Sequence, residues 1–126
     1  RLHSQWNQSS GISPDALRRE IATSTTIIPP IDEDHFLCSF THIFAGGYAA
    51  GYYSYKWAEV LSADAFAAFE EAGLDDEIQM KETGRRFRKT VLELGGSKPP
   101  TEIFEKFRGR SAQTEALIRH SGLGTT

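Results

Sequence analysis

The chain has 126 residues, which is enough for one domain with a hydrophobic core. Its hydrophobic content of 39% and charged content of 25% are typical of a soluble globular domain, and a formal net charge of -3 disfavours nucleic acid as the main partner. No apolar run approaches the roughly 18 residues of a membrane-spanning helix, so we expect no membrane partner. The single cysteine excludes an internal disulfide.

Residues 1–31 are predicted to form a polar connector and a first helix. The chain begins with an arginine rather than a methionine, so we expect it to be part of a longer protein. Ser13 is a suitable N-cap and Pro14 fits the first helical position, which predicts a helix to about Ala22 or Ser24. Two consecutive prolines then impose an extended joint.

The acidic run DEDH at residues 32–35 has two interpretations. Carboxylates beside a histidine can bind a metal, but acids also stabilise the N-terminus of a helix, so we favour a helix start that faces solvent. Apolar side chains then recur at near-helical spacing over residues 36–44. This spacing predicts a short buried segment that carries His42 toward a pair of glycines.

The most unusual stretch is HIFAGGYAAGYYSYKW at residues 42–57, which holds all four tyrosines of the protein. Its glycine pair can form a tight loop whose backbone lies close to a ligand. If a helix follows the loop, Tyr48, Tyr52 and Tyr55 lie on one face, at positions i, i+4 and i+7. Buried tyrosine hydroxyls need hydrogen-bond partners. The stretch therefore indicates either ordinary aromatic packing or a set of donors that face a cleft.

The helix after the loop is predicted to be the longest, from about Ala49 to Ala72, with Gly73 ending it. An acidic turn at residues 75–77 opens the next helix, which is predicted to end at the glycines of residues 95–96. Gly84 lies on the buried stripe of that helix, and close approach of a neighbouring backbone would account for it.

The basic residues within 85–89 are predicted to form a solvated or salt-bridged face, with contacts to another domain as the alternative. Three residues are then predicted to line the apolar side of a short helix that ends in the sequence FRGR, and these are Ile103, Phe104 and Phe107. Ser111 is predicted to cap a last helix that runs to about His120 and turns Leu117 and Ile118 inward. Residues 124–126 are expected to be a tail. Together these patterns predict an all-α fold of about five helices with one long central helix.

The run HIFAGGYAAGYYSY resembles the C-terminal catalytic segment of the thimet oligopeptidase / oligopeptidase A family of zinc metallopeptidases. The resemblance covers roughly residues 35–123. It continues through the following stretches: Trp57–Asp64, Glu82–Arg88, Gly95–Ser97, Phe107–Arg110 and Ser121–Leu123. It implies that residues 32–123 are the C-terminal part of a catalytic domain in a larger, mostly helical metallopeptidase.

The resemblance also implies roles for individual residues. His42 and Tyr55 would stabilise the oxyanion formed during peptide hydrolysis, and Tyr48 would position the substrate backbone. In some family members the histidine lies one residue nearer the glycines, so the role of Tyr55 transfers more directly than that of His42. We also assign substrate binding to three neighbours, namely Gly46, Gly47 and Tyr52.

Family members bind zinc through a His-Glu-x-x-His helix and a later glutamate. None of the four histidines here is followed by glutamate, so we expect no metal site in this chain, with zinc bound elsewhere in the complete enzyme. The implied partners are short peptides and the remaining N-terminal part of the protein, in the cytoplasm or an organelle matrix. The alternative is a stand-alone helical module that binds peptides without cutting them.

Overall fold

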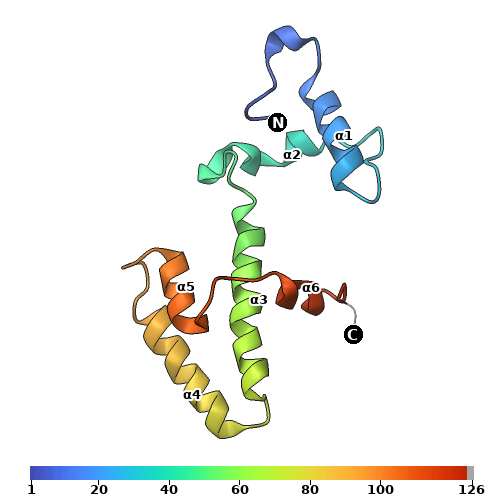
Figure 1. Ribbon diagram of the computed structural model, residues 1–126. Coiled ribbons are helices and arrows are strands. Elements are labelled where there is room, and N and C mark those ends of the chain that lie inside the picture. The colour runs from blue at the N-terminus through green and yellow to red at the C-terminus, as the bar shows by residue number, and fades with distance from the viewer. Residues whose placement is uncertain (125–126) are drawn as a thin grey trace. The chain divides into compact units, whose positions relative to one another are not determined.

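The computed structural model describes residues 1–124, and within that range the secondary structure is entirely helical (Figure 1). Six α-helices are present there: α1 (Pro14–Thr25), α2 (Phe36–Ser39), α3 (Ser54–Ala72), α4 (Glu77–Phe87), α5 (Pro100–Arg108) and α6 (Glu115–His120). Short 3₁₀ turns occupy Gln8–Ser10, Thr41–Ile43 and Ala45–Gly47, and a π-helical turn extends α4 over Arg88–Leu92. The predicted all-α fold and its long helix are confirmed. Most of the predicted tail lies outside the described residues.

The chain divides into two compact units, Arg1–Tyr53 and a second unit that begins at Ser54. In the first unit, α1 starts as predicted, because the Ser13 hydroxyl accepts a hydrogen bond from the Ala16 amide and Pro14 follows directly. The acidic run does not simply face solvent. Asp34 lies 2.9 Å from Arg18 of α1, so part of the run is fastened to the first helix.

The prediction of a buried segment at residues 36–44 is wrong. The exposed fraction is 45% for Phe36 and 65% for Phe44. The apolar core of the first unit consists of Leu17 and Ala22 alone, since these are its fully buried hydrophobic residues. A unit of this size buries too small a share of its surface to cover a row of phenyl rings.

Helix α3 begins at Ser54, five residues later than predicted. The cause is local, because Ala50, inside the predicted helix, has a positive φ angle of 53°. Left-handed residues cannot belong to a right-handed helix. The prediction that three tyrosines share one helical face is therefore wrong, since only Tyr55 lies on α3. The predicted end is confirmed, with Ala72 as the last residue and Gly73 at φ 93°.

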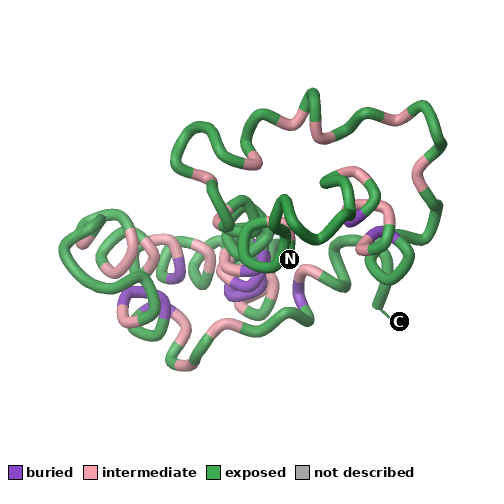
Figure 2. Tube along the Cα trace, turned by 90° about the horizontal axis from the view of Figure 1, so that it is seen from above, coloured by how far each residue is buried: buried purple, intermediate pink, exposed green. Residues whose placement is uncertain are grey.

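In the second unit, α4, α5 and α6 pack on α3. Figure 2 shows the buried residues as short purple patches in a largely exposed trace. Ala63 and Ala67 of α3 meet Ala116 of α6, and small side chains of this kind allow two helices to approach closely. The predicted apolar side of α5 is confirmed, because all three of its residues are buried.

Three details of the second unit differ from the prediction. Gly84 has no neighbouring atom within 4 Å of the position its Cβ would occupy, so close backbone approach does not explain it. Helix α6 begins at Glu115, because the Ser111 hydroxyl donates to Glu105 at 2.7 Å and does not cap a helix. Ile118 is 43% exposed, so Leu117 alone turns inward.

The basic residues after Gly84 are exposed on the helix surface, as predicted. Arg88 lies 3.7 Å from Glu93 in an ion pair. The Arg86 guanidinium carbon lies 5.3 Å from the centre of the Phe107 ring, which is a cation–π distance. These side chains therefore serve surface packing in the described chain.

Asp64 is the most deeply buried polar residue of the second unit, with 1% of its surface exposed. Its carboxylate accepts hydrogen bonds from Arg108 at 3.2 Å, from Arg110 at 2.7 Å and from the Gln113 amide at 2.8 Å. The Arg108 guanidinium also donates two hydrogen bonds to the Glu71 carboxylate, at 2.7 and 2.8 Å, in a bidentate ion pair. This charge cluster fastens the end of α5 and the segment after it to α3.

The charge cluster also sets the protonation of its carboxylates. Burial acts to raise the pKa of Asp64, but the hydrogen bonds from Arg110 and Gln113 and the two arginine charges lower that pKa overall. The hydrogen bonds from Arg108 lower the pKa of Glu71. Both carboxylates are therefore held ionised at neutral pH.

We predict that Asp64→Asn lowers the free energy of unfolding by about 3 kcal/mol, because it removes the buried charge that pairs with Arg108 and Arg110, whose side chains are 4% and 34% exposed. The matched control is Glu71→Gln, whose side chain is 62% exposed. An exposed ion pair contributes about 1 kcal/mol or less, so the control should cost much less. Urea unfolding followed by circular dichroism measures both variants. Equal losses would contradict the central role of Asp64.

A second prediction concerns acid. A carboxylate with a lowered pKa in the folded state stabilises the fold above its unfolded pKa, which is about 3.9 for aspartate. We therefore expect stability to fall as the pH drops from about 4 through the lower folded pKa values of Asp64 and Glu71. Urea midpoints measured between neutral pH and pH 3 test this. Asp64→Asn should flatten the curve, and an unchanged slope would refute the assignment.

Candidate functional site

Four side chains gather in the first unit and form what we call the aromatic cluster: Phe40, His42, Tyr48 and Tyr52. The His42 ring lies 5.1 Å from Tyr48, edge to face, and 5.7 Å from Tyr52. Tyr48 and Tyr52 are themselves 5.7 Å apart, at an angle of 78°. Edge-to-face contacts at these distances are favourable for aromatic pairs. Thus three of the predicted site residues lie together, although no helix face connects them.

Gly46 allows this arrangement in two ways. Its φ of 72° is a conformation that residues with a side chain rarely adopt. In addition, a Cβ at this position would lie 3.2 Å from two carbons of the Tyr48 ring and 3.7 Å from the His42 ring. Gly47 has a similar φ of 77° but no atom within 4 Å of its Cβ position. Gly46 therefore packs under the cluster, whereas Gly47 only turns the chain.

Phe40 is a member of the cluster that sequence reasoning treated as plain core. Its ring lies 4.7 Å from Tyr52 in an edge-to-face contact, and it stacks on Phe36 at 5.0 Å. The one sequence feature that could have placed it in the cluster is its position two residues before His42. Apolar spacing alone could not separate a residue that supports a site from one that fills a core.

Tyr55, the remaining predicted site residue, lies in the second unit. It is the second residue of α3, and 49% of its surface is exposed. Tyr53, which lies two residues before Tyr55 and is the last residue of the first unit, is 74% exposed. The early turns of a helix give a side chain a rigid base, so the position of Tyr55 follows that of α3.

The chemistry of the predicted site residues is that of hydrogen-bond donors. Phenol hydroxyls and imidazole N–H groups donate to oxygen atoms, and His42 and Tyr52 are both exposed to an approaching ligand. Donors fixed in place can stabilise negative charge that develops on a substrate oxygen. The arrangement is suited to binding a peptide backbone or an oxyanion.

The residues present do not fit a zinc ion. Within residues 1–124, no group of three or more histidine, cysteine, aspartate or glutamate side chains could hold a metal. The acidic run beside His35 illustrates this, because Asp34 is paired with Arg18. The sequence also has no His-Glu-x-x-His motif.

Among residues 1–124, no helix is both long and apolar enough to cross a membrane.

Comparison with known proteins gives consistent matches. The model of peptidase family M3 matches residues 1–123. Probable cytosolic oligopeptidase A of Arabidopsis thaliana is 58% identical over 122 residues, which are 97% of this chain and 17% of that protein. Organellar oligopeptidase A, chloroplastic/mitochondrial, of the same plant is 59% identical over 97% of this chain and 15% of its own length. Oligopeptidase A of Escherichia coli K12 is 43% identical over 98% of this chain.

The chain spans 15% to 18% of the length of these relatives. The names of the two plant relatives place one in the cytosol and the other in organelles. The family match covers both units, including the aromatic cluster and Tyr55. On the extent of that match, the chain belongs to peptidase family M3.

Proposed function

We propose that this chain is part of a zinc metallo-oligopeptidase that hydrolyses peptide bonds in short peptides. The observation that supports this most directly is the family match over residues 1–123, together with identities of 43% to 59% to oligopeptidases A. In this proposal the chain contributes transition-state donors and contributes no metal ligand. Zinc is bound by residues outside residues 1–126, in the remaining part of the polypeptide.

Within that enzyme, Tyr55 and His42 donate hydrogen bonds to the oxyanion of the tetrahedral intermediate. Negative charge grows on the carbonyl oxygen only as the intermediate forms, so donors aimed at it stabilise the transition state more than the substrate. Each donor keeps its own proton during this step. The tetrahedral intermediate then collapses: the C=O bond re-forms as the C–N bond breaks, and the leaving nitrogen departs as an amine with the proton that the attacking water gave up.

The remaining cluster residues position the substrate. Tyr48 and Tyr52 contact its backbone, and the loop at Gly46 and Gly47 lets the donors approach it. Support for this comes from the edge-to-face contacts that fix Tyr48 against His42 and from the close fit of Gly46 beneath the Tyr48 ring. The compartment follows the parent protein, either the cytoplasm or an organelle matrix, as the names of the plant relatives suggest.

We predict that Tyr55→Phe in the complete enzyme lowers kcat by about 10²-fold to 10³-fold, because it removes one oxyanion donor. KM should change little, since the hydroxyl acts mainly in the transition state. Steady-state hydrolysis of a short fluorogenic peptide measures both constants. The control is Tyr53→Phe, which removes a hydroxyl two residues away at an exposed site and should leave both constants unchanged. A wild-type kcat for Tyr55→Phe would refute the role.

A second prediction compares the two glycines. Alanine with positive φ costs about 1–2 kcal/mol at either position. Only Gly46→Ala also pushes a methyl group against the Tyr48 ring. Displacing that ring by a fraction of an ångström should lower kcat/KM about tenfold more than Gly47→Ala does, since small misplacements of positioning groups slow catalysis strongly. Equal losses in the two variants would show that the loop conformation matters and the contact with Tyr48 does not.

A further inference from the structure

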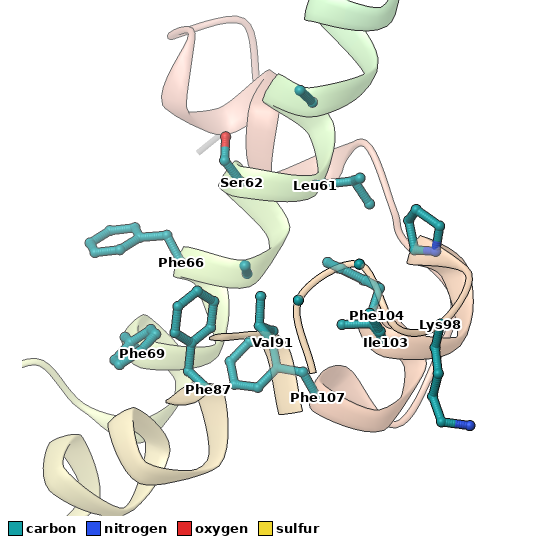
Figure 3. A pocket seen from close by; sticks show the side chains of 15 residues that line it. Leu61, Ser62, Phe66, Phe69, Phe87, Val91, Lys98, Ile103, Phe104 and Phe107 are labelled. Carbon is teal, nitrogen blue, oxygen red and sulfur yellow. The ribbon is translucent and has the colours of Figure 1, made fainter. Parts of the chain in front are cut away.

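The second unit carries an apolar groove of about 730 Å³ between α3, the π-helical extension of α4 and α5 (Figure 3). At one end it is lined by the rings of Phe69, Phe87 and Phe107. Ile103 and Phe104 of α5 lie at the other end, and Ala65 of α3 forms part of the wall. Nothing in the proposed catalytic role uses this groove.

The lining of the groove argues against a small polar ligand. The polar side chains among its described lining residues are Ser62 and Lys98. The Lys98 ammonium is already paired with Glu102 at 2.9 Å, and Figure 3 shows it directed away from the groove. Small-molecule sites usually combine an apolar lining with several convergent polar groups. Those groups are missing here, so the groove fits a purely apolar surface.

Helix α3 points to the same conclusion, because it is apolar on more than one side. One side packs inside the second unit through Ala63, Ala67 and Ala68. Other positions remain open, with Trp57 at 53% and Phe66 at 48% exposure. A helix whose apolar surface extends beyond the face that it packs inside its own unit is typical of an element that other parts of a larger protein cover. The described residues cover only part of it.

We propose that the groove is the docking site for the apolar face of a helix from the part of the family M3 polypeptide that lies outside residues 1–126. The chain spans at most 18% of the relatives compared above, so more than four fifths of such a polypeptide is available to cover it. A helix laid in an apolar groove is a common mode of recognition between helical elements. The inference concerns assembly and does not depend on the proposed catalytic roles.

The test uses the complete polypeptide, with Ala65→Cys adding a thiol in the groove and Cys38→Ser removing the cysteine of residues 1–126. The matched control is Gln79→Cys, at an exposed position of α4 that does not line the groove. The rate of maleimide labelling, read by peptide mass spectrometry, is compared with that of the same protein unfolded in urea. We expect the thiol at position 65 to lose its reactivity in the folded protein and the thiol at 79 to keep it. Equal labelling of both would overturn the proposal.

Two further measurements identify the occupant. If the thiol at position 65 becomes reactive when the protein is diluted to a monomer, a second copy fills the groove and the proposal is wrong. A photo-crosslinking amino acid at position 65 should attach to a peptide from the same monomer that lies outside residues 1–126. A crosslink confined to residues 1–126 would also overturn the proposal. Neither readout uses peptidase activity, so a failed catalytic proposal would leave this test intact.

Discussion

The second unit depends on the buried carboxylate of Asp64. The residues that bind it follow 44 to 49 positions later in the chain, at Arg108, Arg110 and Gln113. A buried charge is tolerated only when it is paired and fully hydrogen-bonded, so these partners must return to α3 for the unit to form. Their return fixes the end of α5, and thereby the wall of the apolar groove that α5 provides. The polar contacts of this one carboxylate thus help to determine where the apolar surfaces of α3 and α5 meet.

The first unit is held together differently. Few of its apolar side chains are fully buried. The contacts that hold it together are mainly those between aromatic rings and the hydrogen bonds from Arg18 to Asp34 in the acidic run. The aromatic cluster relies on the left-handed conformation of Gly46, which brings Tyr48 over the backbone and against His42. Its rings hold one another in place while His42 and Tyr52 stay exposed to an approaching ligand. That combination suits the substrate-positioning role proposed above.

Sequence reasoning succeeded where the signal is local. The N-cap at Ser13, the glycine that ends α3 and the apolar side of α5 were all predicted, since each depends on residues within one or two turns. It failed at Ala50, because alanine gives no sign of a positive φ angle, and that angle delays the start of α3. It also failed to pair Asp64 with two distant arginines. Tyr48 and Tyr52 do lie together, but the helical face that was expected to join them to Tyr55 is wrong.

The groove and the candidate donor Tyr55 are linked through α3. Ala58, which lines the groove, lies three residues after Tyr55, so the two positions are about one helical turn apart. A segment docked in the groove would therefore restrain the first turn of α3 directly. Oxyanion donors are effective only when they are fixed before charge develops. Under the role proposed for Tyr55, a helix docked in the groove would hold the base of this donor, although it would make no contact with the substrate itself.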